Sequence, residues 1–273
     1  MQRILNALIQ FRNVVLYLLL LFFALIFING NSEFHKTIFS RYGFYVSQRF
    51  QSMKYQISHF FSLSEVNKKL LEENTALKAL ELQNNSIALY PDALTQKARF
   101  PFKVVGANVI KNGFLSQRNY VILGRGKAGG IQPEMAVISK NGVVGLVQDV
   151  SENYSNVISI LHQDMKINVR LKNNRAFGSL AWKGKHPQDF QIEDIVTSAQ
   201  IRVGDTLITG GMSSYFPVGI PLGKVVQLDS SQLDGYYTID VKLFEDPSQV
   251  QYVYLLENQD REEITDINQK KNP

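Results

Sequence analysis

The spacing of hydrophobic and polar positions along this chain changes twice. Residues 14–28, VVLYLLLLFFALIFI, form an uninterrupted apolar run. From residue 46 to residue 87 the apolar positions recur at alternating spacings of 3 and 4, and from residue 103 onward they recur in short segments with a period of two. These patterns are typical of a membrane span, a coiled coil and β-strands. The sequence therefore predicts an anchor, a helical stalk and a β-rich part, in that order.

The apolar run at residues 14–28 is the predicted membrane anchor. As a helix it extends about 22 Å, which is short for a hydrocarbon core of about 30 Å. Ile9 and Phe11 can add a turn, while Arg12 reaches the headgroups. A cleaved signal peptide is the alternative, although NGNSEF offers no small-residue cleavage site. Basic residues flank both sides, and the short segment 1–13 favours a cytoplasmic N-terminus with the remainder exported.

A linker at residues 29–44 is predicted to lead into a coiled coil at residues 45–90. A first heptad seam comprises Val46, Phe50, Met53, Ile57 and Phe60, after which the frame slips by one residue. A second seam then contains the predicted dimer contacts Leu63, Val66, Leu70, Leu77, Leu80 and Ile87, with Glu73 and Asn84 at its polar positions. Neither Gly nor Pro occurs between Phe44 and Tyr90, so helix propensity agrees with the pattern. A helix packed on its own domain is the alternative interpretation.

Residues 91–100 are predicted to be a linker, residues 101–257 a β domain, and residues 258–273 a polar, frayed tail. Short strands at regular spacing, with no helical segment between them, indicate antiparallel barrels or a sandwich. The strand candidates are Lys103–Ile110, Asn119–Leu123, Met135–Ser139, Val143–Val150, Val157–Leu161, Ile167–Leu171, Ala176–Trp182, Phe190–Ile192, Thr206–Thr209, Leu222–Leu228, Tyr236–Phe244 and Val250–Leu256.

The net charge of +5 does not indicate a nucleic-acid partner. Residues 1–100 hold 11 Lys and Arg against 6 Asp and Glu, whereas residues 101–257 hold 15 against 14. A nucleic-acid binder usually carries a basic stripe on its folded domain. The absence of cysteine excludes thiolate metal sites, disulfides and a cysteine nucleophile.

A G-x-G-x-x-G stands at residues 124–129, directly after an apolar strand pattern. A dinucleotide site requires a helix after the glycines, and here Pro133 and another strand follow. We therefore interpret these glycines as turn residues at positive φ and expect no cofactor.

The sequence also offers no active site. His162 and His186 lack a serine nucleophile signature, and the closest candidate, GGMSSYF with Ser213 and Ser214, has no partner Asp at a fixed spacing. No histidine or acidic pattern predicts a metal site. We expect no catalytic, cofactor-binding or metal-binding residues.

Two blocks resemble the MreC family of rod shape-determining proteins. In residues 121–171 the family's G-M-A-V, G-V-V-G-x-V and N-Y-S-x-V patterns correspond to Glu134–Val137, Gly142–Val147 and Asn153–Val157, with Glu134 in place of a glycine. In RVGDTLITGGMSSYFPVGIPLGKV, residues 202–225, the G-D-x-V-x-T-S-G-x-x-x-x-F-P-x-G-I-P-x-G-x-V pattern is followed, with Gly210 where the family usually has Ser.

The resemblance implies a single-pass protein of the bacterial cytoplasmic membrane with an extracytoplasmic bulk. It implies a dimerising coiled coil and two antiparallel six-stranded barrels, distantly like those of trypsin-type proteases but without a triad. The family is a scaffold of the cell-elongation machinery that organises peptidoglycan synthesis, as a homodimer or filament. Its implied partners are MreB, MreD, RodA-type polymerases and class B penicillin-binding transpeptidases.

The role of residues 215–221, the most specific part of the second block, stays open. The segment either holds a barrel turn or forms a partner surface, and its residues are Tyr215, Phe216, Pro217, Gly219, Ile220 and Pro221. Two other functions remain as alternatives. A membrane-anchored trypsin-like protease is opposed by the missing nucleophile signature, and a periplasmic adaptor of a secretion pump by the single helical segment preceding all strands.

Overall fold

The computed structural model describes residues 12–31, 63–86, 100–173, 176–196, 200–229 and 236–271. The chain divides into two compact units, Met1–Asn67 and Lys68–Pro273. In the first unit, helix α2 extends from Arg12 to Asn31 and includes the predicted anchor. Among the described residues, no helix combines the length and the apolarity needed to cross a membrane. The membrane anchor therefore stays a prediction. The first heptad seam lies outside the described residues, so this part of the stalk also stays a prediction.

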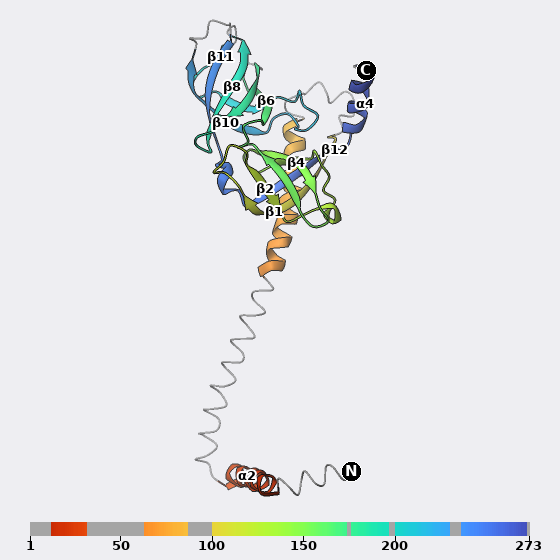
Figure 1. Ribbon diagram of the computed structural model, residues 1–273, viewed down its shortest axis with the longest axis vertical. Coiled ribbons are helices and arrows are strands. Elements are labelled where there is room, and N and C mark those ends of the chain that lie inside the picture. Colours follow the sequence, from red (N-terminus) through yellow and green to blue (C-terminus); the bar gives the residue numbers. More distant parts are fainter. Residues whose placement is uncertain are drawn as a thin grey trace. The chain divides into compact units, whose positions relative to one another are not determined.

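In its described residues, the second unit contains twelve strands, which form two closed antiparallel barrels of six strands each (Figure 1) and confirm the predicted two-barrel β fold. Barrel 1 has the order β1-β12-β3-β4-β5-β2. Its strands are β1 (Phe102–Asn112), β2 (Tyr120–Leu123), β3 (Ala136–Ile138), β4 (Val143–Val150), β5 (Ser155–Ser159) and β12 (Tyr252–Asn258). Barrel 2 has the order β10-β11-β8-β7-β6-β9. Its strands are β6 (Lys166–Leu171), β7 (Phe177–Trp182), β8 (Asp189–Val196), β9 (Thr206–Thr209), β10 (Pro221–Asp229) and β11 (Tyr236–Leu243).

Barrel 2 is inserted between the fifth and the last strand of barrel 1. After β5 the chain crosses through residues 160–165, builds barrel 2, and returns through residues 244–251 to β12. Strand β12 then pairs with β1 from Phe102↔Asn258 to Asn108↔Tyr252 and also pairs with β3. The first and last strands of the β domain therefore close the same barrel, so the boundary between the barrels is crossed twice.

Alternation along the strands produces the two barrel interiors. In β5, for example, Ser155, Val157 and Ser159 are buried, while Asn156 and Ile158 are half-buried. The interior of barrel 1 forms one hydrophobic cluster. The cluster inside barrel 2 continues across the inter-barrel surface and includes Ile138 and Leu256 of barrel 1. The two barrels are thus joined by a shared apolar contact as well as by two chain crossings.

The segment predicted as a frayed tail contains a helix, α4, from Arg261 to Lys271. This prediction is therefore wrong for those residues. Composition suggested disorder because the segment is polar throughout. Glu262 and Glu263 in the first turn stabilise the N-terminal end of the helix dipole. Arg261 makes tertiary contacts, described below, that no local pattern indicates.

The G-x-G-x-x-G segment is a turn between β2 and β3, containing the short 3₁₀ helix η2 (Lys127–Gly129). Positive φ occurs at Gly130, the residue after the motif, and not at Gly126, whose φ is −132°. Gly126 is instead required by close approach, because a Cβ there would lie 2.3 Å from the Ser151 carbonyl oxygen. The expectation of positive φ within the motif is thus wrong, while the interpretation as a turn agrees with the structure.

Candidate functional site

The helix over residues 63–86 packs one face against barrel 1. A Cβ at Gly106 of β1 would lie 2.3 Å from Thr75 Oγ1 and 3.0 Å from Leu71 Cδ1, so the missing side chain lets the helix approach the strand. Two turns further along the helix, Leu82 is only 4% exposed and joins the apolar cluster between the barrels. We call Leu71, Thr75, Lys78 and Leu82 the docked face.

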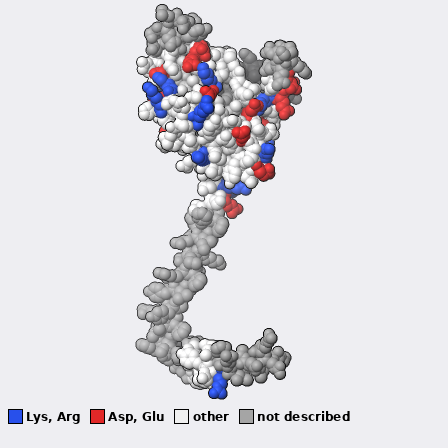
Figure 2. Space-filling model, viewed as in Figure 1, with Lys and Arg blue, Asp and Glu red and all other residues white. Residues whose placement is uncertain are grey.

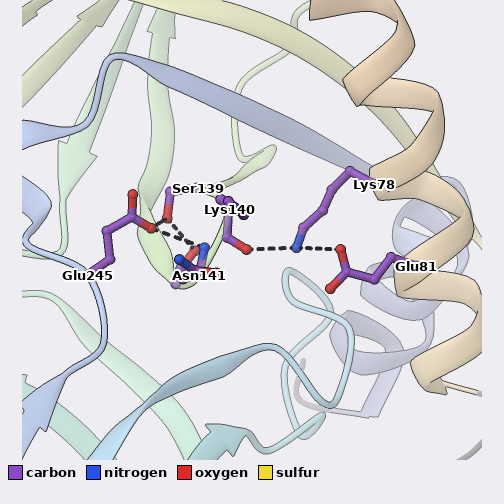
Figure 3. Close-up of polar contacts among 7 residues, drawn as sticks. Lys78, Glu81, Ser139, Lys140, Asn141 and Glu245 are labelled. Atoms are coloured by element: carbon purple, nitrogen blue, oxygen red, sulfur yellow. Dashed lines mark hydrogen bonds and ion pairs between the residues drawn. The ribbon is translucent and has the colours of Figure 1, made fainter.

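Lys78 contributes a buried cation to the docked face. Its side chain is 5% exposed, and its Nζ donates hydrogen bonds to the Lys140 carbonyl oxygen at 2.8 Å and to Glu81 Oε2 at 3.1 Å (Figure 3). A buried ammonium is tolerated only where its charge is compensated and its donors are satisfied. The helix is therefore tied to the β3–β4 turn, residues 139–142, by a directional polar contact.

The same turn is held from its other side by Glu245, which follows β11 (Figure 3). Glu245 Oε2 accepts hydrogen bonds from Ser139 Oγ at 2.5 Å and from the Asn141 backbone N–H at 3.0 Å. Because residues 244–251 connect barrel 2 to barrel 1, the turn joins the helix, barrel 1 and the inter-barrel connection. The three parts are positioned together.

Tyr254 of β12 reports the electrostatics of this junction. Burial raises the pKa of its phenol, and the negative charges of Glu81 and Glu245 raise it further. Both carboxylates thus disfavour the phenolate, and Tyr254 stays neutral at physiological pH.

The opposite face of the helix is apolar and exposed. At about 100° per residue, the predicted dimer seam is centred roughly 140° from the docked face. Its exposed fractions are 48% for Leu63, 51% for Val66, 48% for Leu70, 64% for Leu77 and 56% for Leu80. Ile87, the last predicted contact, lies outside the described residues. The helix thus packs on its own domain through one face and leaves the predicted seam uncovered, so both interpretations of the periodicity are compatible. The coiled coil stays a prediction.

The second sequence block covers β9, the connection between β9 and β10, and the start of β10, and most of its named residues are structural. Phe216 and Ile220 are 5% and 2% exposed, Pro217 is buried, and Gly219 has a φ of 98°. Thr209 Oγ1 donates to the Pro217 carbonyl oxygen at 2.6 Å and accepts from the Ile220 backbone N–H at 2.9 Å. This geometry favours the barrel-turn interpretation for these residues.

Two residues of the same block are less enclosed. Pro221 opens β10 and is half-buried. Tyr215 is also half-buried, and the Arg261 guanidinium of α4 lies 5.5 Å from its ring centroid. The sequence did not reveal this contact, since nothing in the polar C-terminal segment predicted a helix.

The residues considered for chemistry are not brought together as a catalytic site. His162 is buried, and its Nδ1 accepts from the Asp164 backbone N–H at 3.1 Å. Ser213 Oγ accepts from the Tyr215 backbone N–H at 3.1 Å. Within the described part of the chain, no group of three His, Asp or Glu residues could hold a metal ion. On the face shown in Figure 2, acidic and basic side chains of the barrels are interspersed.

Comparisons with known proteins agree with this architecture. The family model described as "Rod shape-determining protein MreC, barrel core" matches residues 109–257, which is more than half of the chain. Cell shape-determining protein MreC of Escherichia coli K12 is 27% identical over 198 residues, covering 72% of this chain and 53% of that protein. Its counterpart from Streptococcus pneumoniae is 27% identical over 162 residues, covering 57% and 59%. The chain therefore spans between half and three-fifths of the length of these relatives.

Two solved structures share the fold. MreC of Listeria monocytogenes superposes with a TM-score of 0.57 at 19% identity, covering 70% of this chain and 94% of that one. The major periplasmic domain from the cell shape-determining filament MreC superposes with a TM-score of 0.50 at 25% identity, covering 57% and 96%. The barrel topology, the matched core and the two sequence blocks lead to one conclusion: this chain belongs to the MreC family of rod shape-determining proteins.

Proposed function

We propose that this chain is a non-enzymatic, membrane-anchored scaffold that helps determine rod shape by organising extracytoplasmic peptidoglycan synthesis in the cell-elongation machinery. The observation that carries the proposal is the helix over residues 63–86, which has one face docked on the barrels and a second, apolar face left exposed. A helix of this kind can hold a second chain while keeping its own barrels in place. That is the geometry of a scaffold.

The exposed seam supplies the dimer contact in this proposal. Its heptad positions, which are apolar except for Glu73 and Asn84, alternate at spacings of 3 and 4, which is what a parallel coiled coil requires. Because Lys78 and Leu82 fix the helix to the barrels, two paired helices would hold two copies of each barrel at one height. Such bivalency raises the effective concentration of binding surfaces for a partner without any new contact.

Anchor, location and partners complete the proposal. Helix α2 carries exposed apolar side chains, including Leu16 at 63% and Phe22 at 61%, which supports placing residues 14–28 in the cytoplasmic membrane. The periplasmic domain named for one structural relative supports an extracytoplasmic position for the barrels. Family resemblance supports MreB, MreD, a RodA-type polymerase and a class B penicillin-binding transpeptidase as partners.

Replacing Leu70 and Leu77 together with Asp tests the seam. Both lie at the same heptad position, where paired carboxylates cannot be buried, so the dimer should dissociate in sedimentation. The control is the double change Leu70→Ile and Leu77→Ile, which keeps the seam apolar and should remain dimeric. A dimer that survives the Asp changes would remove the coiled coil from the proposal.

The cellular function is tested by depleting the protein in its native bacterium. Cells should become round and lose side-wall peptidoglycan synthesis. The Ile double variant should restore the rod, and the Asp double variant should not. Unchanged cell shape on depletion would refute the scaffold function itself.

A further inference from the structure

Arg261, the first residue of helix α4, contacts both barrels. Its guanidinium forms an ion pair with Glu134, and lies 5.5 Å from the ring centroid of Tyr215. Glu134 belongs to the β2–β3 connection of barrel 1, whereas Tyr215 belongs to the β9–β10 connection of barrel 2. Arg261 also donates from Nη1 to the Pro133 carbonyl oxygen at 3.5 Å. One cation therefore bridges two loops that are far apart in the sequence.

Asn258, the last residue of β12, directs the chain toward this position. Its Nδ2 donates to the Ser214 carbonyl oxygen of barrel 2 at 2.7 Å, and its Oδ1 accepts from the Asp260 backbone N–H at 3.1 Å. The Gln259 backbone N–H donates to the Pro101 carbonyl oxygen at 2.9 Å. These bonds place the first turn of α4 where barrel 1 meets the β9–β10 connection of barrel 2.

Glu134 has a backbone conformation that its side chain disfavours. Its φ is 67°, in the left-handed region that residues other than glycine rarely adopt. A non-glycine residue persists in such a conformation where its surroundings determine it. Here the carboxylate supplies the partner of Arg261, which glycine could not provide.

We propose that α4 is a clasp: Arg261, held between Glu134 and Tyr215, limits the range of angles between the two barrels. Ion pairs with arginine and cation–π contacts both have preferred geometries, so together they favour one arrangement of the two loops. The side chains of Arg261 and Glu134 are 29% and 46% exposed, so the clasp can open without unfolding a barrel core. Opening leaves the barrels joined by their shared apolar surface and by residues 160–165 and 244–251. This inference is independent of the dimer seam.

Spin-label distances between the barrels test the clasp. Gln148 on β4 and Lys242 on β11 are exposed, and the chain contains no cysteine, so Gln148→Cys with Lys242→Cys creates one specific label pair. Double electron–electron resonance is measured on the full chain in detergent micelles, diluted with an excess of unlabelled chain to suppress distances between copies. Arg261→Ala should broaden the distance distribution relative to the parent pair.

Matched variants separate a clasp from a general loss of stability. Glu134→Gln and Tyr215→Leu should also broaden the distribution, whereas Tyr215→Phe, which keeps the ring, should not. Asp266→Asn, which removes an exposed carboxylate beyond the first turn of α4, should leave it unchanged. Glu134→Gly relieves the backbone and should melt at a higher temperature than Glu134→Gln, yet broaden the distribution equally.

Two results would overturn the proposal. One is an unchanged distribution in Arg261→Ala with native circular dichroism. The other is a narrow distribution in Glu134→Gly, which would mean that the position matters only for its backbone. If Arg261→Ala does not fold, Arg261→Lys, which loses the planar fork, is measured in its place with the same criterion.

Discussion

Substituting Leu82 with Ala tests whether the stalk helix is truly fixed to the barrels. Leu82 is 4% exposed and lies in the apolar cluster between the barrels. The change removes three buried carbons, worth about 2–3 kcal/mol at roughly 0.8 kcal/mol per methylene. Incomplete collapse of the cavity brings the expected cost to about 3–5 kcal/mol. The loss should fall on docking of the helix, because Leu82 contributes to neither barrel's hydrogen-bonded ladder.

Two measurements distinguish undocking from global unfolding. Amide hydrogen exchange in residues 68–86 should accelerate, because about 3 kcal/mol corresponds to a roughly 100-fold change in an opening equilibrium. Trp182, the only tryptophan, is 8% exposed inside barrel 2, and its fluorescence reports whether that barrel remains folded. We expect fast exchange in the helix with native fluorescence.

Leu80→Ala is the matched control, since it makes the same chemical change two residues away on the exposed seam. Leu80 is 56% exposed, so its truncation should alter docking by about 0.5 kcal/mol or less. It should instead weaken dimerisation. Equal exchange rates in the two variants would refute the assignment of Leu82 to a docked face.

Two further outcomes follow from the polar contacts. Thr209→Val should lower the free energy of unfolding by about 2–4 kcal/mol in urea titrations, because the Pro217 carbonyl and the Ile220 N–H each lose a buried hydrogen-bond partner. A decrease no larger than that of a Thr→Val change at an exposed position would contradict this. Because the pKa of Tyr254 is raised in the folded protein, the free energy of unfolding should be unaffected by this group below pH 10 and should fall as pH rises through the folded pKa. In Tyr254→Phe this alkaline decrease should be smaller than in the parent protein. Parent and variant curves of unfolding free energy against pH with the same alkaline decrease would contradict the assignment.

The alternation of apolar and polar residues was sufficient to predict the positions of the strands in this protein. Each of the twelve predicted segments contains or overlaps an observed strand, and Val143–Val150 and Thr206–Thr209 match at both ends. This success has a physical reason, since a strand with one buried face must alternate whichever strand it pairs with. The identity of the pairing partner leaves no such trace. Nothing in Tyr252–Asn258 indicates that it closes the first barrel against Phe102–Asn112.

The candidate site was predicted only in part, because periodicity is visible in the sequence while tertiary contacts are not. The exposed seam was visible as a heptad, but the docked face was not, because Thr75 and Lys78 interrupt its apolar character. Lys78 is buried only because the Lys140 carbonyl oxygen and Glu81 satisfy its donors. The clasp was missed because its three side chains come from distant segments.

The sequence by itself determined the strands, the helix over residues 63–86 with its apolar seam, and the family to which the chain belongs, but not helix α4. Secondary structure depends mainly on residues close together in the sequence, so the spacing of apolar residues along the chain reveals it. Only the tertiary structure decided that barrel 2 is an insertion, that the stalk helix has a second, docked face, and that Arg261 joins the two barrels. Each of these depends on contacts between residues distant in sequence, whose free energy comes from burial and charge pairing that exist only once the chain has folded.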